Sequence, residues 1–266
     1  MSLELIKQLR ETTGAGMVDC KKALEEVGGD MDKAIEILRK KGIAKAAKRG
    51  ERETCEGLIL VEASDDNKEG YILEITSETD FVARNEQFQN LVKEIMEVIK
   101  KEKPTDLEAL FGISMGDMTV KETIDNLSGT IGEKLEVKRF DILNGATVSA
   151  YSHLGGKIGV LVALNQEGKS ELATDVAMQI AATDPKYLKP EEVPVEEIDK
   201  EKEIYKEQLL KEGKPENIID NILEGKVKKY YEDVCLLKQE YTKEDKKTVE
   251  EILGDVNVEK FIRYSL

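Results

Sequence analysis

The chain has 266 residues, of which 40% are hydrophobic and 36% charged, and its formal net charge is −15 at pH 7. This length allows two or three compact units, and the acidic balance argues against a general nucleic-acid or anionic-membrane binder. The three cysteines lie far apart without metal-ligand spacing, which predicts reduced thiols. No secretory signal is recognised, and no apolar run approaches the ~20 residues of a membrane span, so we expect a cytoplasmic protein.

The first 54 residues are predicted to form a bundle of three short helices followed by a basic linker. Ser2 and Asp30 stand at positions that favour N-cap residues. The third helix is expected to end before Gly42, because glycine is a common helix stop. Residues 39–52 are basic and alanine-rich without aromatic residues, which favours a solvated linker over an RNA-binding arm.

The loop between the first two helices, at residues 13–16, contains two glycines and leads directly to Met17 and Val18. A bundle this small has little core of its own. We therefore expect these two apolar side chains to stay accessible to a partner.

The central part of the chain repeats one order of elements. Alternating apolar residues predict a strand hairpin at residues 57–75 followed by an amphipathic helix at 85–101. The same order recurs as a hairpin at 146–164 and a helix at 170–182. We therefore predict an α+β fold whose core has two related halves, each an antiparallel sheet with helices.

Residues 190–233 are predicted to form an inserted helical hairpin with a narrow, coiled-coil-like apolar seam. The seam residues are Val195, Ile198, Tyr205 and Leu209 on the first helix, and Ile218, Ile219, Ile222, Leu223, Val227 and Tyr230 on the second. A short helix and a final strand then follow. The predicted core halves are therefore residues 55–144 for the first, and residues 145–189 together with 234–266 for the second.

Between the first hairpin and its helix the chain reads SETDFVAR, residues 77–84. Ser77 or Thr79 is positioned to cap a helix whose first turn holds Asp80 and Phe81. Phe is common in protein cores, but this one follows an acidic residue in a polar turn. Core packing and an outward contact both remain open for Phe81 at this point.

The sequence offers little for catalysis. Its single histidine, His153, lies in a predicted hairpin turn beside Gly155 and Gly156, and a solvated turn histidine is the more frequent case. The glycines lack phosphate-loop spacing, and no metal-binding motif is recognised. We predict a binding protein rather than an enzyme, without cofactor or metal.

Four sequence blocks carry a family resemblance. They are LRETTGAGMVDCKKAL at residues 9–24, TDFVA at 79–83, IGVLV at 158–162 and FIRY at 261–264. Their order and spacing resemble elongation factor Ts across essentially the whole chain, and the first two blocks are highly specific.

The resemblance implies a guanine-nucleotide exchange factor for elongation factor Tu, with a ubiquitin-associated-like N-terminal bundle, a two-part core and a protruding helical hairpin. It implies that one segment disturbs the Mg²⁺ and phosphate site of the GTPase to release GDP, and that GTP later displaces the factor. In this sequence that segment is Thr79, Asp80, Phe81 and Val82. Further implied contacts with elongation factor Tu are Lys21, Ile131, Gly132 and His153, and we add Met17 because it is expected to be an accessible apolar residue of the bundle.

The chain departs from the family pattern where Thr242 and Lys243 replace an apolar pair after the hairpin. Because Leu266 follows the FIRY block so closely, we expect that the C-terminal helical module of longer members is lacking. We expect no direct nucleic-acid or membrane partner. The resemblance implies that the helical hairpin serves either in forming a homodimer or in an additional partner contact, and the sequence leaves both open. The rival hypotheses are an adaptor built on the N-terminal bundle without exchange activity, and an enzyme that depends on His153.

Overall fold

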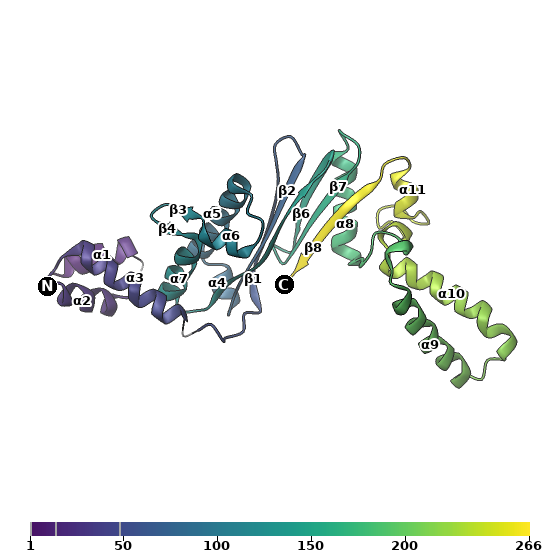
Figure 1. The fold of residues 1–266 in the computed structure, drawn as a ribbon, viewed down its shortest axis with the longest axis horizontal. Coiled ribbons are helices and arrows are strands. Elements are labelled where there is room, and N and C mark those ends of the chain that lie inside the picture. Colours follow the sequence, from purple (N-terminus) through teal and green to yellow (C-terminus); the bar gives the residue numbers. More distant parts are fainter. Residues whose placement is uncertain (1, 14, 48) are drawn as a thin grey trace. The chain divides into compact units, whose positions relative to one another are not determined.

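The computed structural model describes residues 2–13, 15–47 and 49–266, with the backbone alone for residues 43–47 and 216–217. Gly14 of the predicted turn and Lys48 of the predicted linker lie outside the described residues. The chain divides into two compact units. Figure 1 labels the helices and strands that make them up. The first unit comprises Met1–Leu60, Tyr71–Asp141 and Ser265–Leu266, and the second comprises Val61–Gly70 and Ile142–Tyr264.

Three helices form the N-terminal bundle of the first unit: α1 (Leu3–Thr13), α2 (Met17–Glu26) and α3 (Met31–Ala47). Both predicted caps are confirmed: the Leu5 amide donates to Ser2 Oγ at 3.2 Å, and the Lys33 amide to Asp30 Oδ1 at 3.1 Å. A small apolar core joins the helices, made of Ile6, Leu9, Cys20, Ala23, Leu24, Ala34 and Leu38.

The predicted end of the third helix before Gly42 is wrong, because α3 continues through Gly42 to Ala47. At this point α3 crosses α7 (Val120–Ile131), and Gly42 approaches Gly129 of that helix. Arg39 adds an ion pair to Glu122 at 2.8 Å. The glycine therefore permits a close helix crossing rather than a stop, and residues 39–47 of the basic stretch are helical.

The first three-stranded sheet has the order β1 (Glu56–Ala63), β2 (Glu69–Ser77) and β5 (Leu135–Asn144). The helices that accompany it are α4 (Asp80–Ala83), α5 (Glu86–Glu102), α6 (Leu107–Gly112) and α7. A two-stranded ribbon that the sequence did not predict, β3 (Ser114–Met115) with β4 (Met118–Thr119), precedes α7. The buried face of α5 presents Phe88, Leu91, Val92, Ile95, Met96 and Ile99.

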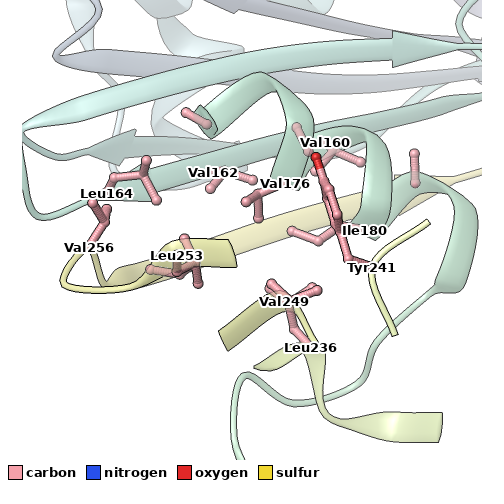
Figure 2. Packing of buried hydrophobic residues seen from close by; sticks show 14 residues of the cluster. Val160, Val162, Leu164, Val176, Ile180, Leu236, Tyr241, Val249, Leu253 and Val256 are labelled. Atoms are coloured by element: carbon pink, nitrogen blue, oxygen red, sulfur yellow. The ribbon is translucent and has the colours of Figure 1, made fainter. Parts of the chain in front are cut away.

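The second sheet repeats this plan with the order β6 (Thr147–His153), β7 (Ile158–Leu164) and β8 (Val258–Ser265). The hairpin is antiparallel, with His153 opposite Ile158, so His153 ends a strand rather than lying in the turn. Helix α8 (Ser170–Thr183) follows. Figure 2 shows side chains of β7 and α8 meeting those of the C-terminal segments, among them Leu253 of α11 (Val249–Leu253). The predicted mixed α+β fold is confirmed.

The helical pair consists of α9 (Val195–Lys211) and α10 (Glu216–Val234), with the short 3-10 helices η1 (Pro190–Glu192) and η2 (Leu236–Lys238) at its base. The apolar seam is confirmed for Ile198, Leu209 and Ile219, which are buried. It is wrong for Val195 and Ile218, which are 70% and 38% exposed. At the base, the Tyr187 hydroxyl donates to Glu197 Oε2 at 2.7 Å, which ties the start of α9 to the preceding segment.

Candidate partner-binding site

The SETDFVAR stretch folds as a short turn of helix, α4, directly after β2. Val82 and Ala83 are buried, whereas Phe81 is 81% exposed. Successive helical residues differ by about 100° in direction, so a single turn that buries two neighbours can hold the third outward. The structure therefore excludes core packing for Phe81, which points away from the core.

Neither predicted helix cap is present, because no side chain caps α4. Thr79 occupies the N-cap position, but its hydroxyl donates to Glu133 Oε1 at 2.7 Å and its amide donates to Glu133 Oε2 at 3.0 Å. The Ser77 hydroxyl donates to the Thr79 carbonyl at 3.0 Å. Glu133 therefore binds the N-cap residue itself, and it does not accept from the first amides of α4 as a capping side chain would.

Glu78, the residue before Thr79, is held by the same loop. The Lys134 amide donates to Glu78 Oε1 at 2.6 Å, and Arg52 Nη1 lies 3.1 Å from the same oxygen. Burial raises the pKa of Glu78, but the Lys134 amide and the Arg52 guanidinium together outweigh it, so the pKa lies below its usual value. Glu78 therefore remains ionised and bridges two parts of the first unit.

Asp80 lies beside Phe81 and forms an ion pair with Arg84 across one helical turn, Oδ2 to Nη2 at 3.1 Å. Both side chains are well exposed, so this pair adds little to stability. The Asp80 carboxylate therefore lies at the surface in the residue next to Phe81.

The predicted contact residues Ile131 and Gly132 lie at the end of α7. Gly132 caps this helix in the left-handed region, with φ of 92°, and its amide donates to the Ser128 carbonyl at 2.9 Å. The next residue is Glu133, which binds Thr79. Ile131 and Gly132 therefore directly precede Glu133, the residue that binds Thr79 of the Phe81 segment. Both are partly exposed.

On the N-terminal bundle, Lys21 is exposed and lies 3.8 Å from Glu25, one turn further along α2. Met17 starts α2 and is partly buried against the bundle core, whereas Val18 is 66% exposed. Of the two apolar residues predicted to be accessible, Val18 therefore provides more exposed surface.

His153 belongs to the second unit. Its side chain is exposed, and its Nδ1 lies 3.1 Å from the Tyr151 hydroxyl. The two rings stack with centroids 5.9 Å apart. The next residue, Leu154, is exposed and adopts a positive φ of 51°. This strand end presents an aromatic and an apolar side chain at the surface.

The two residues that depart from the family pattern are bound into the second unit. The Thr242 amide donates to Gln179 Oε1 at 2.9 Å, and Lys243 forms an ion pair with Asp175. The hydroxyl of the buried Tyr241 also donates to Asp175, at 3.2 Å. Polar contacts within the chain thus occupy this position.

Across residues 2–13, 15–47 and 49–266, no group of three or more His, Cys, Asp or Glu residues is arranged to hold a metal ion. Within those same ranges, no helix is both long and apolar enough to cross a membrane.

Sequence reasoning missed Glu133, Glu78 and Arg52, which position the Phe81 segment. Glu133 and Thr79 are separated by 54 residues, so no local pattern signals their contact.

A comparison with protein-family models finds a match to Elongation factor TS over residues 78–266. The matched range includes the Phe81 segment, the Ile131–Gly132 pair, His153 and the helical hairpin. Members of this family are nucleotide exchange factors that carry out no covalent chemistry. The chain belongs to the elongation factor Ts family, and this membership implies that it binds elongation factor Tu and exchanges its nucleotide.

Proposed function

We propose that the chain releases GDP from elongation factor Tu by pressing Phe81 and its neighbours, residues 79–82, against the elements that hold Mg²⁺ and the phosphates. The observation that carries this proposal is the 81% exposure of Phe81 on a turn whose next two residues are buried. Burying a Phe side chain contributes about 1.5–3 kcal/mol, so an exposed one at a fixed position has binding energy to offer a partner.

A nucleotide bound with Mg²⁺ is held by many charge-assisted contacts, so its release is slow until that site is deformed. A rigid aromatic side chain inserted beside the site displaces the groups that support the metal, and Asp80 adds a negative charge there. The factor must bind the nucleotide-free GTPase most tightly, because a partner shifts an equilibrium only by its differential affinity. By reciprocity, incoming GTP weakens this binding and the factor leaves.

The remaining site residues are proposed to dock the two proteins. Lys21, together with Met17 and the exposed Val18 beside it, presents the N-terminal bundle to the GTPase. Ile131 and Gly132 adjoin the Phe81 segment, and His153 supplies a contact from the second unit. We further propose a cytoplasmic location, and a homodimer formed through the α9–α10 hairpin.

The test is the release of fluorescent GDP from elongation factor Tu, measured with and without this protein. The intact protein is expected to accelerate release, and Phe81→Ala to lose most of that acceleration while still binding the GTPase. Full acceleration by Phe81→Ala would remove the Phe81 mechanism. Binding without any acceleration by the intact protein would favour the adaptor hypothesis instead.

A further inference from the structure

Thr79 is the point at which the Phe81 segment is attached to the rest of the first unit. Its amide and its hydroxyl both donate to the carboxylate of Glu133, at 3.0 Å and 2.7 Å. Hydrogen bonds to a charged group are stronger than those between neutral groups. We propose that Glu133 is a positioning residue for nucleotide exchange, one that fixes the direction in which Phe81 points; this inference rests on the proposed function.

The backbone that carries Glu133 is itself firmly held. The hydroxyl of Ser128, a buried residue, donates to the Glu133 carbonyl at 2.6 Å. Arg49 Nη1 in turn donates to the Ser128 carbonyl at 3.1 Å. The left-handed Gly132 turns the chain out of α7 directly before this residue. Glu133 therefore offers Thr79 a fixed acceptor rather than a mobile surface side chain.

A second contact runs parallel to the first. Glu78 accepts from the Lys134 amide, so two consecutive residues of the segment are joined to two consecutive residues of the α7–β5 loop. Such a two-point attachment fixes orientation, whereas a single bond would leave a pivot. Arg52, which follows the N-terminal bundle, also binds the Glu78 carboxylate, and its carbonyl accepts from Lys134 Nζ at 3.1 Å.

The helix α4 cannot hold Phe81 in place alone. It spans only Asp80–Ala83, and a single turn fixes several dihedral angles in return for few hydrogen bonds. Its direction must therefore come from its attachment to the rest of the unit. Without the Glu133 carboxylate, residues 79–82 would have to become ordered when the partner binds. The entropy cost of that ordering would offset part of the binding energy of Phe81, so less would be left to deform the partner.

The proposal is tested with Glu133→Gln, Phe81→Ala, the double variant, and Glu108→Gln as a control with the same charge change at an exposed site on α6. The measurement is release of fluorescent GDP from elongation factor Tu over a range of factor concentrations. Glu133→Gln is expected to lower the maximal rate about tenfold, with a much smaller change in the half-saturating concentration. Glu108→Gln is expected to behave as the unmodified protein.

In the Phe81→Ala background, Glu133→Gln is expected to have no further effect, because its action passes through Phe81. The Thr79 amide proton should also exchange faster with solvent in Glu133→Gln, while the melting temperature stays close to that of the unmodified protein.

Three results would overturn the role of Glu133. The first is a normal maximal rate of GDP release with Glu133→Gln. The second is that Glu133→Gln lowers this rate as much in the Phe81→Ala background as in the unmodified protein, and the third is that Glu108→Gln lowers it as much as Glu133→Gln does. Normal release by Phe81→Ala would instead overturn the Phe81 mechanism itself, so the two failures are distinguishable.

Discussion

Gly129 of α7 faces Gly42 of α3 so closely that a Cβ atom added to Gly129 would lie 2.5 Å from the Cα of Gly42. The reverse is not true, because the nearest described atom to a Cβ added to Gly42 would be Asn126 Oδ1, at 3.6 Å, an ordinary contact distance. The two glycines therefore have unequal roles at the crossing that joins the N-terminal bundle to α7.

Gly129→Ala should destabilise the first unit by about 1–3 kcal/mol, since neither helix backbone can move away without disturbing its packing. Gly42→Ala should be neutral, or stabilising by up to about 1 kcal/mol, because alanine is the better helix former and its methyl group fits. The free energy of unfolding in urea measures both effects. Gly112→Ala, where an added Cβ meets nothing within 4 Å, is the control. Equal losses in Gly42→Ala and Gly129→Ala would contradict the asymmetry.

Phe81→Ala and Val82→Ala should separate function from stability at adjacent positions. Phe81 is exposed, so its removal should change the free energy of unfolding by less than about 0.5 kcal/mol. Val82 is buried, and its truncation should cost about 1–3 kcal/mol. Chemical denaturation of the two variants makes the comparison. A large loss of stability in Phe81→Ala would mean that the ring packs against the protein in solution.

The sequence predicted those features that depend on local periodicity, and missed those that depend on distant contacts. The hairpin-and-helix order of both halves was predicted because the alternation of apolar and polar residues in strands, and the apolar face of an amphipathic helix, both depend on residues close together in the sequence. The attachment of Thr79 to Glu133 was missed because it joins residues far apart in the chain. Gly42 was misread as a helix stop because a glycine required for close packing looks, in sequence, the same as one that ends a helix.

The ionised form of Glu78 should make the first unit sensitive to acid. Its pKa is lowered in the folded state, so its stabilising effect is complete above the usual value of about 4.5 and is lost as the pH falls through the folded pKa. Glu78→Gln should therefore be less stable than the unmodified protein at pH 7, and the difference should shrink below about pH 4.5. Urea unfolding between pH 7 and pH 3 measures this, and a difference that stays constant with pH would contradict it.

The three cysteines should differ sharply in reactivity. Cys20 and Cys235 are buried and Cys55 is exposed. Burial, with smaller effects from Glu191 and Glu192, raises the pKa of Cys235 to about 11, and burial likewise raises the pKa of Cys20. Ellman's reagent at pH 8 should therefore label one thiol quickly in the folded protein and all three in denaturant. Cys55→Ser should abolish the fast phase; a fast phase that persists would show that a buried thiol is accessible.

The α9–α10 hairpin should be removable without unfolding the second unit. Its two ends already lie together, because Tyr187 and Cys235 form a parallel β-bridge and the Leu236 amide donates to the Tyr187 carbonyl at 2.9 Å. The large apolar cluster of this unit contains none of the α9 and α10 side chains that the structure describes. Replacing residues 190–233 by a short glycine–serine link should therefore leave that cluster intact and keep the acceleration of GDP release.

The proposed homodimer should be lost in this shortened chain, as measured by analytical ultracentrifugation beside the full chain. A shortened chain that still dimerises would place the dimer contact elsewhere, and one that no longer accelerates GDP release would show that the hairpin contributes to exchange.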